Sequence, residues 1–119
     1  MKVAVVIANG CEEVEALTPI DVFRRMGVQA DMVGLGSQDI MGAHQIALHC
    51  DRIVDDQLLD YDCVIFPGGM GGAHALRDND QLMDLMQKRQ SNGQWNAAMC
   101  AAPIAFARYG LLDNHDYTC

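Results

Sequence analysis

Several features that mark other classes of protein are missing from this sequence. Its five cysteines include no C-x-x-C pair, its Lys and Arg residues form no cluster, and no apolar run is long enough for a signal peptide or a membrane span. An odd cysteine count without paired spacing predicts neither a disulfide framework nor a zinc knuckle, and the default compartment is a reducing cytoplasm. A formal charge of −8, from 16 acidic and 8 basic residues, argues against nucleic acid and anionic membranes as partners.

Signals for bound metals and cofactors are also missing. His49, Cys50 and Asp51 are consecutive, and a strand directs consecutive side chains to opposite faces, so they do not form a ligand set. Neither G-x-x-x-x-G-K-[ST] nor a G-x-G-x-x-G that opens a helix occurs. The sequence therefore predicts no metal and no cofactor.

The sequence does contain an alternation of short apolar runs and helical segments. We expect buried strands at 2–8, 28–35, 61–66 and 97–99, with helices at 12–27, 73–77, 79–92 and 103–109. This order is typical of an α/β protein with a doubly wound, mainly parallel sheet. Between these elements we expect a hairpin outside the main sheet at 37–48 and a short turn or strand at 51–60, and a further strand begins at 117–119.

Two of the predicted helices have apolar residues spaced along one face. In the first one, Val14, Leu17 and Met26 are predicted to face the sheet, and Pro19 is predicted to interrupt the helix with a kink. Acidic residues in its first turn complement the helix dipole. In the segment 79–92, the predicted buried residues are Leu82, Leu85 and Met86, and the predicted partly solvated ones are Met83, Lys88 and Arg89.

Cys100 occupies the corner between the strand at 97–99 and the helix that begins near Pro103. Small neighbours such as Ala98 and Ala101 allow a sharp bend, as at the nucleophile elbow of hydrolases. A thiol below a helix N-terminus is favoured as the thiolate. The alternative is that Cys100 is one more buried apolar residue, because free cysteine is often buried.

Two further segments end at the same predicted edge of the sheet as Cys100. The carboxyl ends of parallel strands lie together, so residues 10–15, the loop at 67–72 and Cys100 are expected to converge. Four glycines in that loop would let backbone amides approach an anion, although a flexible loop is the plainer interpretation.

Three motifs resemble those of the DJ-1/PfpI (ThiJ) family: Ala-Asn-Gly-Cys-Glu-Glu-Val-Glu at 8–15, Phe-Pro-Gly-Gly at 66–69 and Ala-Ala-Met-Cys-Ala-Ala-Pro at 97–103. They occur in the family's order and cover essentially the whole chain. The resemblance implies a flavodoxin-like fold of the class I glutamine amidotransferase type and a homodimer. It also implies one domain over residues 1–119, truncated at the C-terminus, because the family's domains continue for roughly a third more of their length. A partly covered sheet would expose apolar surface, so we expect marginal stability or a partner.

The resemblance also implies roles for individual residues. Cys100 corresponds to the nucleophilic, readily oxidised cysteine, and Glu15 to the glutamate beside it. The backbone amides of Gly69 and Ala101 correspond to the oxyanion donors. A carboxyl group near a thiol would share a proton with it and serve as proton donor and acceptor. Without the resemblance, Glu15 would be interpreted as a surface acid that complements the helix dipole.

Departures from the family pattern affect the histidines. Members that act as peptidases have histidine directly after the nucleophile, where this chain has Ala101, so peptidase activity is disfavoured. Many members have a histidine after the cysteine helix, at or beyond Cys119, and His115 comes too early to match it. His44 and His74 are considered as residues flanking a pocket.

The leading functional hypothesis is a protein of oxidative and carbonyl stress. In its enzymatic form, of glyoxalase or deglycase type, Cys100 attacks a small-molecule carbonyl such as an α-oxoaldehyde or an early glycation adduct. The alternative is a non-catalytic chaperone in which an oxidant modifies Cys100. An intracellular hydrolase, or a member with the older thiazole monophosphate biosynthesis label, stays open as a third possibility.

Overall fold

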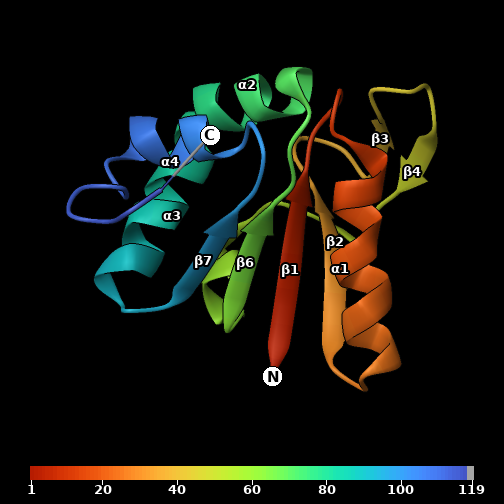
Figure 1. The fold of residues 1–119 in the computed structure, drawn as a ribbon. Helices are drawn as coiled ribbons and strands as arrows, with labels where there is room; N and C mark the ends of the chain where they lie inside the picture. Colours follow the sequence, from red (N-terminus) through yellow and green to blue (C-terminus); the bar gives the residue numbers. More distant parts are fainter. Residues whose placement is uncertain (118–119) are drawn as a thin grey trace.

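The computed structural model describes residues 1–117, and its core is a five-stranded sheet in the order β5-β2-β1-β6-β7 (Figure 1). All four strand pairings are parallel. The strands of this sheet are β1 (Lys2–Ile7), β2 (Gln29–Gly34), β5 (Arg52–Ile53), β6 (Cys63–Phe66) and β7 (Trp95–Ala98). The helices are α1 (Glu13–Arg25), α2 (Met70–Asp78), α3 (Asp80–Ser91) and α4 (Pro103–Tyr109), with a 3-10 turn η1 (Asp56–Asp60). The predicted α/β class and parallel sheet are confirmed.

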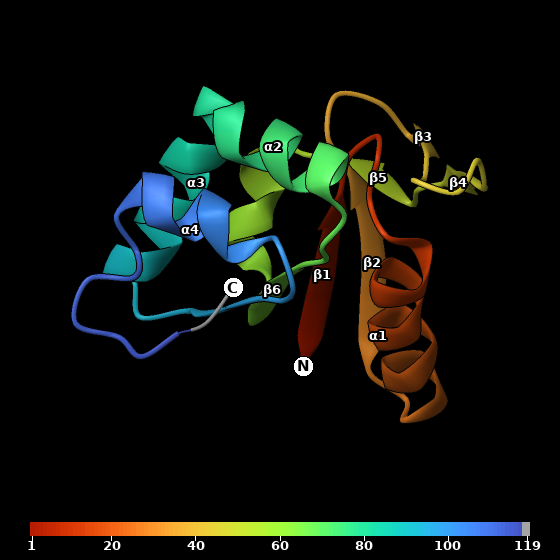
Figure 2. The ribbon, with the colours of Figure 1, turned by 45° about the horizontal axis from the view of Figure 1, so that its top comes forward.

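The central strand β1 is buried on both faces. Ala4 and Val6 pack in a cluster with residues of α2, α3 and α4, whereas Val3, Val5 and Ile7 pack with residues of α1. Figure 2 shows α1 on one side of the sheet and the other three helices on the opposite side. Consecutive strand residues point to opposite faces, so an uninterrupted apolar run is required where helices cover both.

The apolar face predicted for α1 is wrong. The helix buries Glu13, Ala16 and Ile20, whereas Val14 is 70% exposed and Met26 is 67% exposed. The helix also continues through Pro19 to Arg25 instead of being interrupted there. Glu13 occupies a buried position at which an apolar residue is expected. The apolar pattern of the sequence therefore indicates the face that carries Val14, which is not the face that contacts the sheet.

Between β2 and β6 the chain forms the predicted small hairpin outside the main sheet. Strands β3 (Asp39–Met41) and β4 (Ala47–His49) pair antiparallel and extend beyond α1 (Figure 1). The segment that follows contains β5, which pairs with β2 as one edge of the sheet, and η1. Both a short strand and a short turn are therefore present in the segment 51–60.

Helices α2 and α3 follow the glycine-rich segment. α2 starts at Met70, directly after Gly69, so the predicted loop at 67–72 is helical over its second half. Asn79 caps α3 through a hydrogen bond from the Leu82 amide (2.8 Å). Leu82, Leu85 and Met86 are buried as predicted, but Arg89 is fully buried rather than partly solvated.

Strand β7 lies at the other edge of the sheet. We predicted a strand buried on both faces, but Trp95 is 77% exposed and Ala97 is also exposed. Its only partner among residues 1–117 is β6. The predicted strand at 117–119 lies mostly outside the described residues. No helix within residues 1–117 is both long and apolar enough to cross a lipid bilayer.

Candidate functional site

Cys100 is exposed at the sharp corner between β7 and α4. Its backbone adopts a φ of 55°, a left-handed conformation that costs a non-glycine residue about 1–3 kcal/mol. The Met99 amide donates to the Phe66 carbonyl (3.2 Å), and the Ala102 amide donates to the Met99 carbonyl (3.0 Å). The chain therefore holds Cys100 in a strained turn above the end of the sheet, and the predicted strand-to-helix corner is present.

Glu15 and Cys100 both come close to Gly68. Its amide donates to Glu15 Oε1 (2.8 Å). A Cβ atom added to Gly68 would lie 2.5 Å from Glu15 Oε1, 2.8 Å from Cys100 Cβ and 3.3 Å from the Ala101 nitrogen. The carboxylate, the thiol-bearing residue and the following amide thus surround one buried glycine. The predicted convergence of residues 10–15, the 67–72 segment and Cys100 is present in the structure.

Gly69 is the N-cap residue of α2 and has a φ of 92°. A Cβ there would come within 2.5 Å of both the Glu12 nitrogen and the Gly10 carbonyl oxygen, so a side chain is excluded by both conformation and space. The Glu12 amide donates to the Gly68 carbonyl (2.9 Å), which ties the start of α1 to this turn. Gly69 follows Gly68 directly in the chain, whereas Ala101 approaches Gly68 from the segment that carries Cys100.

The other described thiols differ from Cys100 in their surroundings. Cys11 and Cys50 are buried, and burial raises the pKa of each thiol to about 11. Burial also raises the pKa of Cys63, which is partly covered in β6. A raised pKa lowers the thiolate fraction, and the thiolate is the reactive form. Among the cysteines within residues 1–117, Cys100 alone is exposed.

His44 and Glu13 form a contact that the sequence did not predict. The His44 ring nitrogen Nδ1 lies 2.8 Å from Glu13 Oε1, and the His44 amide donates to Glu13 Oε2 (2.8 Å). Hydrogen bonding from His44 lowers the pKa of Glu13 to about 2, and the same contact raises the pKa of His44. Residues 31 positions apart carry no periodic signal, so only the fold reveals this pair.

His74 and His115 belong to other segments than the Cys100 corner. His74 is exposed on α2, and the His115 amide donates to the Leu112 carbonyl (3.0 Å). A cavity of about 390 Å³ lies along the outer edge of β7, where its lining includes Asn96, Phe106 and Tyr117 but not Cys100. The candidate site is therefore an open corner rather than this cavity.

The packing around Gly68 leads to a mutational prediction. Gly68→Ala should slow alkylation of Cys100 by iodoacetamide at least about tenfold, because the new methyl group must displace Glu15 or Cys100, and small misplacements of reacting groups carry large rate costs. Peptide-resolved mass spectrometry measures the rate.

Gly71→Ala is the matched control for this prediction. Its added Cβ would meet its nearest neighbour, the Gly10 Cα atom, at an ordinary 3.4 Å, and the residue lies within α2. Alkylation in this control should stay within about twofold of wild type, since alanine favours a helix. Equal rates in Gly68→Ala and wild type, with both folded by circular dichroism, would contradict the tight arrangement.

Comparisons with known proteins agree with this architecture. The family model described as the DJ-1/PfpI family matches residues 1–119. The chain is 32% identical over 116 residues to Protein dj-1beta of Drosophila melanogaster, covering 96% of this chain and 62% of that protein. It is 30% identical over 110 residues to the Parkinson disease protein 7 homolog of Danio rerio, covering 90% and 58%. Among solved structures, oxidized DJ-1 of Toxoplasma gondii superposes with a TM-score of 0.86 at 30% identity, covering 95% and 63% of the two chains.

Fold and sequence together define an α/β protein with a parallel sheet. A glycine turn and a cysteine corner lie at the carboxyl ends of its strands. The chain belongs to the DJ-1/PfpI family. It spans less than two thirds of the length of these relatives.

Proposed function

We propose that this protein is a cysteine-dependent enzyme that detoxifies α-oxoaldehydes such as methylglyoxal or early glycation adducts. The observation that carries the proposal is the arrangement around Gly68, where Glu15 Oε1 and Cys100 Cβ both approach the space that a side chain on Gly68 would fill. Cys100 is exposed and held in a strained turn, which is a feature of nucleophiles at strand-to-helix corners. Membership of the DJ-1/PfpI family supports the assignment.

The proposed first step is addition of Cys100 Sγ to the aldehyde carbon. The S–C bond forms as the carbonyl π bond breaks, and negative charge develops on the oxygen. The amides of Gly69 and Ala101 are proposed to stabilise that oxyanion. The Glu15 carboxylate is proposed to accept the proton of the Cys100 thiol as the S–C bond forms and to pass it to the oxygen, which yields a hemithioacetal.

The second half of the proposed reaction needs no external oxidant or reductant. Glu15, again a carboxylate, takes the proton from the former aldehyde carbon and returns it to the adjacent carbonyl carbon, while the proton of the hemithioacetal hydroxyl passes to the oxygen of that adjacent carbon. The hemithioacetal thereby becomes a hydroxyacyl thioester. Water hydrolyses the thioester, which releases a 2-hydroxy acid and restores the Cys100 thiol.

A second candidate function is a redox-responsive chaperone. The exposure of Cys100 favours it, because an oxidant can reach this sulfur without unfolding the protein. One similar structure is described as oxidized DJ-1 of Toxoplasma gondii. In this alternative, oxidation of Cys100 changes surface contacts, and no carbonyl substrate is consumed.

We further propose that residues 1–119 form most of one DJ-1/PfpI domain without its C-terminal part, and that the protein acts as a cytoplasmic homodimer. The relatives extend well beyond the matched region, which supports the first statement. Val14 and Val22 of α1 and Met26, the C-cap residue after it, are apolar and exposed. A subunit contact would remove such a surface from water.

Mild peroxide treatment followed by peptide mapping tests whether Cys100 is the reactive sulfur. We expect sulfenic and then sulfinic acid at Cys100 before any change at Cys11, Cys50 or Cys63, since exposure and thiolate character govern oxidation. Parallel assays of methylglyoxal loss distinguish the enzyme from the chaperone. Earlier oxidation of Cys11 or Cys50 would refute the assignment of the site, and a reactive Cys100 without methylglyoxal loss would favour the chaperone.

A further inference from the structure

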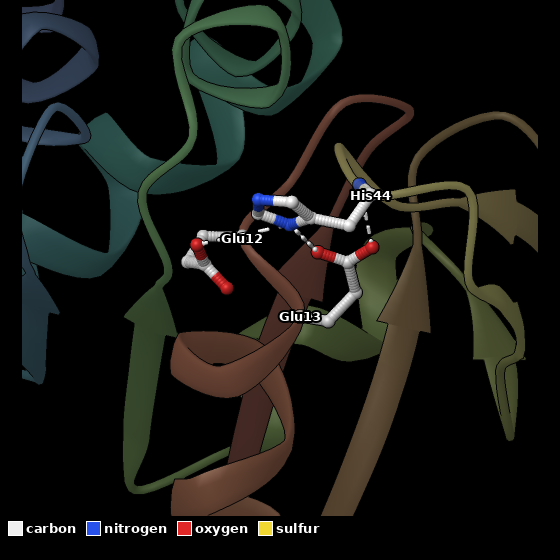
Figure 3. A group of neighbouring side chains, drawn as sticks. All are labelled: Glu12, Glu13 and His44. Atoms are coloured by element: carbon white, nitrogen blue, oxygen red, sulfur yellow. Dashed lines mark hydrogen bonds and ion pairs between the residues drawn. The ribbon is translucent and has the colours of Figure 1, made fainter.

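A second group of polar side chains lies at the start of α1. Glu12 and Glu13 meet His44 from the turn between β3 and β4, and their ligand atoms all lie within 4.8 Å of one another (Figure 3). Among residues 1–117, no other three His, Cys, Asp or Glu side chains meet in this way. The group contains one imidazole and two carboxylates, a donor set that first-row divalent metal ions bind.

Glu13 is the most firmly positioned member of this group. Its side chain is 4% exposed, and its Oε2 atom accepts hydrogen bonds from the amides of His44 (2.8 Å) and Ile46 (3.4 Å). Gly42 makes room for it, because a Cβ at that position would lie 2.4 Å from the carboxylate. Oε1 is thereby directed at the His44 ring, 2.8 Å from Nδ1. Backbone donors of this kind orient a metal-binding carboxylate in established metal sites.

The turn that carries His44 is attached to the start of α1 by backbone contacts. The Gly10 amide donates to the Met41 carbonyl (2.9 Å), and the Ala43 amide donates to the Cys11 carbonyl (2.8 Å). The Asn9 side chain accepts from the Met41 amide (2.9 Å). The two segments that supply the ligand atoms are therefore fixed relative to each other.

Glu12 is the third member of the group, and it approaches the same ring nitrogen of His44 as Glu13 does. Its Oε1 atom caps α1 by accepting from the Val14 amide (3.0 Å), and its Oε2 atom lies 4.0 Å from His44 Nδ1. Zinc bonds of about 2.0–2.2 Å to nitrogen and oxygen place ligand atoms about 3.0–3.5 Å apart. The two separations from Nδ1, 2.8 and 4.0 Å, bracket that range, and the carboxylate atoms of Glu12 and Glu13 lie within 4.8 Å of each other, so side-chain rotation must bring these two together.

We propose that His44 Nδ1, Glu13 Oε1 and Glu12 Oε2 form a binding site for a first-row divalent metal ion such as Zn²⁺. The His44 side chain is 66% exposed, which leaves an entry path and a coordination position for water. The ion replaces the proton on Nδ1, which is released to solvent. Two carboxylates and one neutral imidazole balance the charge of the ion. The site goes beyond the proposed function and uses neither Cys100 nor Glu15.

The contact between His49 and Asp39 provides an internal comparison. Its Nδ1 to Oδ1 distance is 2.9 Å, almost the same as in the His44 and Glu13 contact. Both side chains are largely exposed, and no third ligand among residues 1–117 joins them. A single pair without a second carboxylate should hold a metal ion only weakly, so His49→Gln is a matched control for His44→Gln.

Calorimetric titration with Zn²⁺ tests the proposal. The Cys100→Ser variant serves as background, because an exposed thiolate also binds zinc. We expect one equivalent of Zn²⁺ to bind, with affinity at least about tenfold weaker when His44→Gln or Glu12→Gln is added, and unchanged when His49→Gln is added. Glu12→Gln keeps an oxygen that caps α1, so its effect reports on metal ligation apart from folding.

Several results would overturn the site. These are the absence of saturable Zn²⁺ binding below about 1 mM in the Cys100→Ser background, wild-type affinity in both His44→Gln and Glu12→Gln, or an equal loss in His49→Gln. Titration with Co²⁺ adds a spectroscopic criterion. Weak ligand-field bands without sulfur charge transfer support nitrogen and oxygen ligands, whereas strong sulfur bands would place the ion on a cysteine. Loss of methylglyoxal turnover in Cys100→Ser leaves this result unaffected, so the two proposals fail separately.

Discussion

Replacement of Cys100 by Ser is expected to lower methylglyoxal consumption by about a thousandfold or more, because the proposed bond-forming atom is lost and a serine hydroxyl is a far weaker nucleophile near neutral pH. Cys100 is exposed, so its side chain contributes little apolar burial to the fold. Its thermal unfolding midpoint should therefore stay close to that of wild type. Loss of methylglyoxal followed over time, together with D-lactate or L-lactate formation, measures the effect.

Cys63→Ser is the control for this prediction. Cys63 lies at the first position of β6 and pairs with Val3 and Trp95, so it occupies the amino end of the strands, opposite the Gly68 turn. Activity in this variant should remain within a few-fold of wild type, with at most a modest loss of stability. Full activity in Cys100→Ser would eliminate the proposed mechanism, and full loss in Cys63→Ser would point to a sulfur other than Cys100.

Arg89→Met is expected to lower the free energy of unfolding by about 3–5 kcal/mol, because it removes the charged donor of four hydrogen bonds from the interior. The Arg89 side chain is fully buried and donates to the carbonyls of Leu58 (2.9 Å), Tyr61 (2.7 Å) and Trp95 (2.8 Å). It also donates to Asn96 Oδ1 (2.8 Å). One guanidinium thus joins α3, the end of η1 and the start of β7.

Urea denaturation of Arg89→Met, Arg89→Lys and Lys88→Met measures this contribution. Arg89→Lys should lose about half as much as Arg89→Met, because an ammonium group retains the charge but lacks the planar set of five donors. Lys88 is exposed on the same helix, so Lys88→Met should change stability by less than about 0.5 kcal/mol. A midpoint for Arg89→Met equal to that of Lys88→Met would show that the buried hydrogen bonds contribute little.

The burial of Arg89 is a feature that the sequence pattern did not predict. Basic residues in the last turn of a helix are commonly solvated, and the sequence predicted partial solvation for Arg89. The carbonyl groups that bind it belong to segments that precede it by about 30 positions and follow it by only a few. Neither periodicity nor composition reports such partners.

The same reasoning applies to α1. Its length and start were predictable from the acidic first turn and the glycine after it, but its buried face was not. Glu13 replaces an apolar residue on that face because the β3–β4 turn supplies two amides and an imidazole to its carboxylate. A buried carboxylate is stable only where such donors meet it, and the fold provides them.

By itself, the sequence determined the order of strands and helices, the parallel sheet and the corner that carries Cys100, since local backbone preferences and apolar runs specify these features. It also determined membership of the DJ-1/PfpI family through three motifs near strand ends. Only the tertiary structure decided that Glu15 and Cys100 meet at Gly68, that Glu12, Glu13 and His44 meet, and that Arg89 is buried. Each of these contacts joins residues from separate segments, and their geometry depends on how the helices and turns pack, which local sequence does not encode.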